Sequence, residues 1–293
     1  MKKIFNLIIL VFSLINLTSC TTIIPTLPII NQAINNNSEK TNNTNDSINS
    51  MPFINSNKYA VEINQNFMQN EKDGRVYLKT EYPYISLIGL DDNTSLHDTI
   101  NTINKNQEKE ANDFMENTND SAIEALFESD MYEGTMYFTQ ESKMKVERKD
   151  DKLLVLSNQI YYDAGGAHPS TNSVFTNIHI PTGKELKIDD VVVDKDNFYD
   201  TLKTELKKQN PDYGFFEDWE NNIDTYKKGY IDLSEGNEDG EELRYEVTLN
   251  FMLLDGKLNV YFNPYDLGPY ASGGVGVNLP YDEFKDIIKD EYK

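Results

Sequence analysis

The chain of 293 residues contains a single cysteine, Cys20. One cysteine permits no disulfide within the chain, so the fold must be held together by its apolar core alone. The 18 tyrosines and 14 phenylalanines make such a core possible and argue against a disordered chain. About 235 residues follow the polar N-terminal region, which is enough for one large domain or two closely packed halves.

The position of Cys20 predicts a lipid anchor. A basic start at residues 1–3 precedes an apolar run from Ile4 to Leu17, and Leu17-Thr18-Ser19-Cys20 has the form of a bacterial lipobox. The run of about 14 residues is too short to span a bilayer and suits the core of a signal peptide. We therefore expect residues 1–19 to be a lipoprotein signal peptide and Cys20 to be lipidated. The alternative is an ordinary secretory signal with an accidental cysteine.

This anchor would place the protein in the cell envelope, outside the cytoplasm and attached to the membrane only through its lipid. Lipidation consumes the thiol, which excludes thiol catalysis and redox work. The segment 20–58 is rich in asparagine and poor in apolar residues, so we expect it to be a disordered tether. A polar coil of this length has an end-to-end distance of about 30–35 Å.

The acidic charge limits the choice of partners. Residues 1–50 hold three of the 27 basic and two of the 49 acidic residues, so residues 51–293 carry a net charge of −23. Such a field repels nucleic acid and anionic lipid, and it attracts cationic proteins. We therefore expect no nucleic-acid partner, and either a cationic ligand or a charge that serves only solubility.

Periodic apolar residues predict both strands and helices. Alternating positions predict strands at 75–87, 136–146, 153–162, 174–180, 244–253, 258–262 and 275–279. Apolar residues spaced three and four positions apart predict helices. They indicate a long helix at 96–114 that pauses at 117–120 and resumes to 127, a short helix at 198–206 and a closing helix at 284–288. Strands joined by hairpins beside a few helices indicate an α+β fold on antiparallel sheet, in two intimate halves.

Three segments carry a family resemblance. They are Tyr82-Pro83-Tyr84-Ile85, the loop from Tyr162 to Pro169 with the later run from Pro181 to Leu186, and the tail from Phe262 to Gly274. In this order they resemble the PdaC/RsiV-like family of bacterial envelope proteins, over about residues 59–290. The resemblance implies a PdaC-like N-terminal domain at 59–162, an RsiV-like C-terminal domain at 163–293, and an antiparallel sheet packed with helices.

The resemblance also implies a class of function. One relative is an anti-sigma factor that binds lysozyme, and another carries these domains beside a peptidoglycan deacetylase. Neither a sigma-binding segment nor a deacetylase domain is found in this sequence. The expectation is therefore an envelope lipoprotein that binds an extracellular protein, a lysozyme-type muramidase, as decoy, inhibitor or sensor. The alternative is a peptidoglycan-binding accessory module or a cryptic wall-modifying enzyme.

Two glycine-rich loops are the candidate binding elements. The first has two glycines for close backbone approach, a histidine that can donate or accept near neutral pH, and a stiffening proline. The second glycine-rich loop spans 268–276. It is expected either to lie near the first loop or to be simply a turn between two strands. A tryptophan between acidic residues is a third candidate, as an exposed anchor or a core residue. The candidate ligand-binding residues are Gly165, Gly166, Ala167, His168, Trp219, Tyr270, Gly273 and Gly274.

No catalytic constellation or cofactor motif is recognisable. The three histidines, His97, His168 and His179, have no metal-ligand spacing. The acidic run at 232–242 departs from a calcium-binding loop because Asn237 stands where glycine is required, so a solvated charged loop is the simpler interpretation. Nothing singles out a carboxylate pair for glycoside hydrolysis. We therefore expect no metal and no cofactor, and a binding protein rather than an enzyme.

Overall fold

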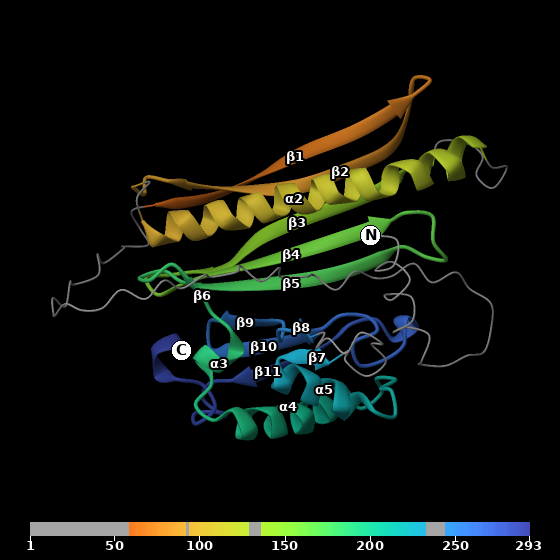
Figure 1. Ribbon diagram of the computed structural model, residues 1–293. Helices are drawn as coiled ribbons and strands as arrows, with labels where there is room; N and C mark the ends of the chain where they lie inside the picture. The colour runs from red at the N-terminus through yellow and green to blue at the C-terminus, as the bar shows by residue number, and fades with distance from the viewer. Residues whose placement is uncertain (1–58, 92–93, 129–135, 233–243) are drawn as a thin grey trace.

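The computed structural model describes residues 59–91, 94–128, 136–232 and 244–293. A large curled sheet and one long helix form the first layer, and smaller sheets with three helices form the second (Figure 1). The expected α+β class with predominantly antiparallel sheets is confirmed.

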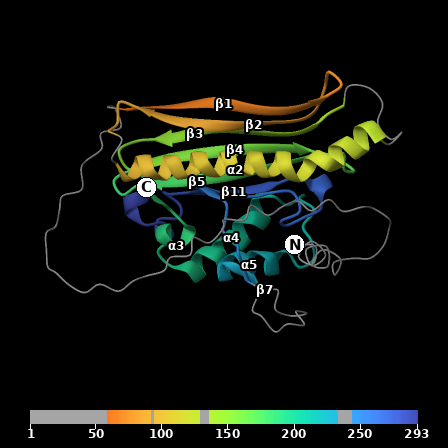
Figure 2. The same ribbon diagram turned by 45° about the horizontal axis from the view of Figure 1, so that its top comes forward.

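The first layer is a six-stranded sheet whose spatial order follows the chain. Its strands are β1 (Ala60–Lys72), β2 (Arg75–Ile88), β3 (Phe138–Lys149), β4 (Leu153–Asp163), β5 (Ser170–His179) and β6 (Lys184–Glu185). Helix α2 (Ser95–Ile123) and the π-helical turn η2 (Glu124–Glu128) connect β2 to β3, which therefore pair in parallel. The other neighbours are antiparallel, and Figure 2 shows α2 running along the strands of the sheet.

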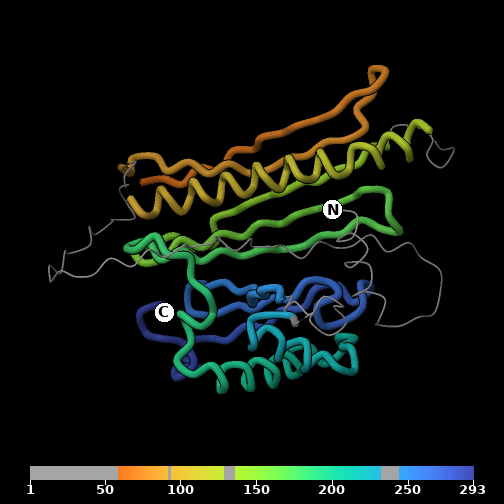
Figure 3. The backbone as a smooth tube through the Cα atoms, in the orientation of Figure 1, coloured from red at the N-terminus to blue at the C-terminus, as the bar shows by residue number. Residues whose placement is uncertain are grey.

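The chain enters the second layer after β6 (Figure 3). This layer has a three-stranded sheet ordered β11-β10-β9 and a two-stranded sheet of β7 and β8. Its elements are α3 (Ile188–Val191), α4 (Lys195–Gln209), α5 (Trp219–Lys228), β7 (Tyr230–Asp232), β8 (Arg244–Glu246), β9 (Phe251–Leu254), β10 (Lys257–Phe262), η3 (Tyr270–Ser272), β11 (Val275–Pro280) and η4 (Asp290–Tyr292).

Strand β4 joins the two layers through its side chains. Leu153 and Val155 belong to the core shared with α4 and the three-stranded sheet, whereas Leu154 and Leu156 belong to the core beneath α2. All four are buried because successive side chains of a strand point to opposite faces. The sheet also continues across the boundary expected between residues 162 and 163, since β4 pairs with β5 along its length.

Asparagine side chains join β5 to the second layer. The amide of Asn177 donates to the carbonyl of Phe251 at 2.7 Å and accepts from the amide of Leu253 at 2.8 Å. The amides of Asn250 and Asn263 bond in the same way to backbone groups of β5. Each asparagine amide carries one donor group and one acceptor like a peptide unit, so these side chains extend the β-ladder across the layer boundary.

Three sequence expectations are wrong in detail. Helix α2 does not pause at 117–120, because Asn119 accepts from the hydroxyl of Tyr77 and from Asn70 and so ties this turn to the sheet. The closing helix at 284–288 is absent; the backbone there bonds instead to 191–193. The strand expected at 244–253 is divided into β8 and β9, because the chain passes from the two-stranded to the three-stranded sheet.

Candidate functional site

Two hairpin loops from different parts of the chain meet at one end of the sheets. The first, residues 164–169, connects β4 to β5, and the second, residues 263–274, connects β10 to β11. The imidazole of His168 stacks on the ring of Tyr270 with centroids 3.7 Å apart and planes 17° apart. Tyr265 lies beside the same imidazole at 6.4 Å. We call His168, Tyr265 and Tyr270 the aromatic–histidine cluster.

Hydrogen bonds fix the tautomer of His168. Its Nδ1 lies 3.1 Å from the carbonyl oxygen of Pro169, which can only accept, so Nδ1 carries a proton. Its Nε2 lies 3.2 Å from the hydroxyl of Tyr265 and accepts from it when the imidazole is neutral. The hydroxyl of Tyr270 donates to the same Pro169 carbonyl at 2.6 Å. The cluster is thus oriented before any ligand arrives.

Asp163, the last residue of β4, shapes the start of the first loop. The carboxylate of Asp163 accepts from the amide of Gly165 at 3.4 Å and from the hydroxyl of Tyr161 at 3.4 Å. Gly166, Ala167 and His168 are exposed at the tip of the loop. The sequence-predicted loop residues are therefore accessible to a ligand.

The second loop is anchored by Asp266. Its carboxylate accepts from the amide of Asn263 at 2.7 Å, and its backbone carbonyl accepts from Asn222 at 2.9 Å. Burial raises the pKa of Asp266 to about 6, although the Asn263 amide and the Tyr226 hydroxyl act in the opposite direction. The loop that presents Tyr265 and Tyr270 thus contains a carboxyl group that is unusually easy to protonate.

The two predicted glycines of the second loop have structural positions. A Cβ on Gly274 would lie 2.0 Å from the hydroxyl oxygen of Tyr261, so only glycine allows this approach. The carbonyl of Gly273 accepts from the hydroxyl of Tyr213 at 2.9 Å. Among the candidates of this loop, Tyr270 is the one that joins the cluster.

Of the two alternatives for Trp219, an exposed anchor or a core residue, the structure shows the core residue. The residue is 7% exposed, begins α5, and packs on Phe215 with ring centroids 4.6 Å apart. The acidic neighbours Glu217, Asp218 and Glu220 are exposed. Trp219 therefore offers no stacking face to a ligand.

Sequence reasoning missed Tyr265. It has a positive φ of 75°, which is rare for a residue other than glycine, and it is 46% exposed. A strained, exposed aromatic residue of this kind often marks a functional loop. The available signal was its place in the run Asn263-Pro264-Tyr265-Asp266, which is typical of a tight turn.

Some predicted features lie outside the residues that the structure describes, and the described residues form neither a metal site nor a membrane-spanning helix. Cys20 and residues 233–242 of the acidic run lie outside the described residues. In the described ranges, no group of three or more His, Cys, Asp or Glu residues is arranged to hold a metal ion. Nor does any helix in those ranges have the length and apolar character needed to cross a membrane.

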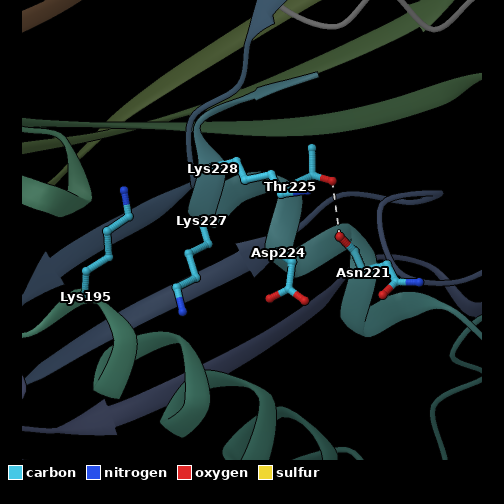
Figure 4. A pocket seen from close by; sticks show the side chains of 6 residues that line it. All are labelled: Lys195, Asn221, Asp224, Thr225, Lys227 and Lys228. Atoms are coloured by element: carbon cyan, nitrogen blue, oxygen red, sulfur yellow. Dashed lines mark hydrogen bonds between the residues drawn. The ribbon is translucent and has the colours of Figure 1, made fainter. Parts of the chain in front are cut away.

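A hollow of about 740 Å³ lies between the start of α4 and α5 (Figure 4). Two of its three lysines already have carboxylate partners: Lys195 pairs with Asp189 at 2.7 Å and Lys227 with Asp196 at 2.6 Å. Asp224, on the same wall, pairs with Lys203 at 2.6 Å. The pairs of Lys227 and Asp224 hold α5 against α4, the pair of Lys195 joins α4 to α3, and we assign the hollow no ligand.

A smaller hollow of about 280 Å³ lies between the β1–β2 hairpin and α2. Its lining combines two tyrosine rings, three asparagines and a pair of opposite charges. Tyr84 is 44% exposed, whereas Asn104 is buried and bonds both backbone groups of Ile85, at 2.8 and 2.9 Å. The lining residues are Asn66, Tyr82, Tyr84, Asn101, Asn104, Lys105 and Glu108.

Comparisons with known proteins support the fold. A family model described as a protein of unknown function, DUF3298, matches residues 189–282. A solved structure of a DUF3298 family member from Bacteroides fragilis is similar, with a TM-score of 0.55 and 16% identity over 81% of this chain and 96% of that one. A second, from Pseudomonas aeruginosa, has a TM-score of 0.47 and 16% identity over 80% and 95%. No curated protein matches the sequence.

Proposed function

We propose that this protein is an envelope lipoprotein, anchored through Cys20, that binds a cationic extracellular protein of the lysozyme type. The observation that carries the proposal is the aromatic–histidine cluster. It gathers the exposed rings of His168 and Tyr265 and the half-buried ring of Tyr270 into one pre-oriented tip, which reduces the ordering cost of binding. The PdaC/RsiV-like resemblance supplies the class of ligand, and the DUF3298 match is compatible with it.

The charge of the chain supports a cationic partner. A net charge of −23 over residues 51–293 would accelerate association with a basic enzyme, and this steering weakens as salt rises. The exposed loop tip at Gly166–His168 would enter the partner's cleft, with Tyr265 and Tyr270 supporting the imidazole from behind. Blocking that cleft would make the protein a decoy, inhibitor or sensor.

Calorimetry tests the ligand. Residues 21–293, which retain every described element, are titrated with hen-type lysozyme at about 0.05 and 0.3 M salt, where screening differs strongly. Micromolar or tighter binding that weakens with salt and blocks lysozyme activity is expected. Gly166→Trp at the loop tip should reduce affinity at least tenfold, whereas Gly74→Trp in the remote β1–β2 turn should not. Absence of binding at low salt refutes the lysozyme proposal.

A separate experiment tests the anchor. Cys20→Ala in the full chain removes the thiol that a lipid would modify. The wild-type protein should sediment with membranes and incorporate labelled fatty acid, and the variant should do neither. Equal membrane association of the two proteins would contradict lipidation while leaving the ligand proposal untouched.

The hollow lined by Tyr82 and Tyr84 favours a second candidate, a peptidoglycan-binding module. The exposed aromatic face of Tyr84 can stack on a sugar ring, and the amide groups beside it can bond to N-acetyl and hydroxyl groups. Titration with N-acetylglucosamine oligomers should shift NMR signals of this hollow with little dependence on salt. Tyr84→Ala should abolish those shifts and His168→Ala should not; the absence of any shift refutes this candidate.

A further inference from the structure

Strand β1 is an open edge of the large sheet. It is the outermost strand in Figure 1, and β2 is its one strand partner in the described chain. Its 13 residues span about 43 Å at the usual rise per residue. The other side of the sheet is closed, because β5 bonds to β6 and to the asparagine amides of the second layer. Among the described strands, β1 therefore presents the longest edge without a strand partner.

β1 lacks the devices that usually protect an edge strand. It contains no proline, its sole lysine is its last residue, Lys72, and its register shift lies near the end, between Asn70 and Glu71. Residues 63–70 carry no charge. Phe67, near the middle, is 72% exposed, more than any other large hydrophobic residue of the described chain. An edge of this kind pairs readily with another strand.

The sequence of β1 is complementary to itself in one antiparallel register. With Phe67 opposite Phe67 of a second copy, Glu62 lies opposite Lys72 at both ends. A slip of one residue either way places Glu62 opposite Glu71 or Asp73 instead, and like charges directly opposite each other are destabilising. The charges therefore select the register that also brings the two exposed phenylalanines together.

The two charged residues are available for this pairing. Glu62 is exposed and forms no ion pair within the described residues. The ammonium nitrogen of Lys72 lies 4.9 Å from the ring centroid of Phe127, and no described carboxylate forms a salt bridge with it. Each Glu62–Lys72 pair across the interface would give both groups an opposite charge that the described residues of one copy do not supply.

We propose that the protein forms a symmetric dimer through antiparallel pairing of β1 with β1 of a second copy, centred on Phe67. Pairing of residues 62–72 would form about 11 backbone hydrogen bonds, close to the number in an average protein interface. The two-fold symmetry uses the same edge of both copies, so the assembly closes at two and does not grow into a fibre. Pairing buries the Phe67 rings against each other.

Charge reversal tests both the interface and its register. In residues 21–293, Glu62→Lys and Lys72→Glu each create two like-charge pairs and should weaken the dimer about tenfold or more by sedimentation velocity. An equimolar mixture of the two variants should form a heterodimer with wild-type affinity, because every pair is then opposite in charge. The double variant should also dimerise. Glu116→Lys, an equal charge change on exposed α2, should leave the dimer intact.

Each contrary outcome overturns the proposal. A wild-type protein that remains monomeric at about 100 μM has no such dimer. Dimers that tolerate both single variants use another surface. Weakening by both variants without recovery in the mixture means that Glu62 and Lys72 are not opposite each other. Circular dichroism of each variant separates these outcomes from misfolding, and all of them leave the ligand proposal unaffected.

Discussion

Replacing Asp266 with asparagine should stabilise the protein, and more so at high pH. Burial raises the pKa of this carboxyl from its ordinary 3.8 to about 6, so the folded state binds its proton more tightly than the unfolded state does. Stability contributed by the protonated form is therefore lost as pH rises from 3.8 to 6. Asparagine keeps an oxygen that can accept from the amide of Asn263 and never ionises.

The magnitude follows from the two pKa values. An increase from 3.8 to about 6 corresponds to up to about 3 kcal/mol of lost stability when both states are fully ionised. Roughly half of this loss occurs below pH 5, because the unfolded state ionises first. The advantage of Asp266→Asn over the wild type should therefore grow by about 1.4 kcal/mol between pH 5 and pH 8.

Urea unfolding at pH 5 and pH 8 measures this difference, with the fluorescence of the single tryptophan, Trp219, as the signal. Trp219 is well placed because it is buried and packs on Phe215 in the second layer. Asp212→Asn, at an exposed position, is the control and should show no such growth. An equal effect of Asp266→Asn at both pH values would refute the argument that burial raises the pKa of the Asp266 carboxyl.

Two other substitutions test one contact within the first layer, between Gly183 and α2, and one between the layers, at Asn177. Gly183→Ala should cost at least about 2 kcal/mol more than Gly74→Ala in thermal unfolding, since both have positive φ but only at Gly183 would the new Cβ lie 2.4 Å from backbone atoms of Ser95. Equal costs would show that this contact relaxes freely. Asn177→Ala should cost about 2–4 kcal/mol, because two buried backbone groups of β9 lose their partner, whereas the exposed Gln159→Ala should change stability by less than 0.5 kcal/mol.

Local sequence signals predicted most of the elements that turns and periodicity define. The reversal at 149–152 separates β3 from β4, and Asp255-Gly256 separates β9 from β10, as the turn residues indicate. Helix α4 ends at Gln209, two residues before Pro211, as proline requires. These elements depend on nearby residues, which a single sequence displays.

Elements that depend on distant partners were not predictable in this way. Strand β1 shows no clean alternation because much of it is exposed at an edge, so its pattern resembles polar coil. The apolar residues near 284–288 suit a helix, yet the backbone there forms turns and hydrogen bonds to 191–193 instead. Likewise, Trp219 lies among acidic residues in sequence, but α5 turns its ring inward.

The candidate site was predictable in part for the same reason. Glycines and Pro169 mark the first loop locally, and the second loop is marked by 268–276. The two loops meet, and His168 stacks on Tyr270, because β5 bonds across to the second layer. No local sequence signal reveals this long-range pairing. Tyr265 was missed because its importance lies in its contact with His168 and its positive φ.

The asparagines connect these observations. Asn104 bonds to β2 where β3 diverges from it, and Asn177, Asn250 and Asn263 link β5 to the second layer, so neutral amides satisfy strand groups that another strand does not reach. The protein thus protects its edges mainly with amides rather than with charge. In β1 the same amide-rich composition has no neighbouring strand on its outer side within the described chain. A second β1 offers that missing neighbour, which is why the charge-reversal mixture is the decisive experiment on this surface.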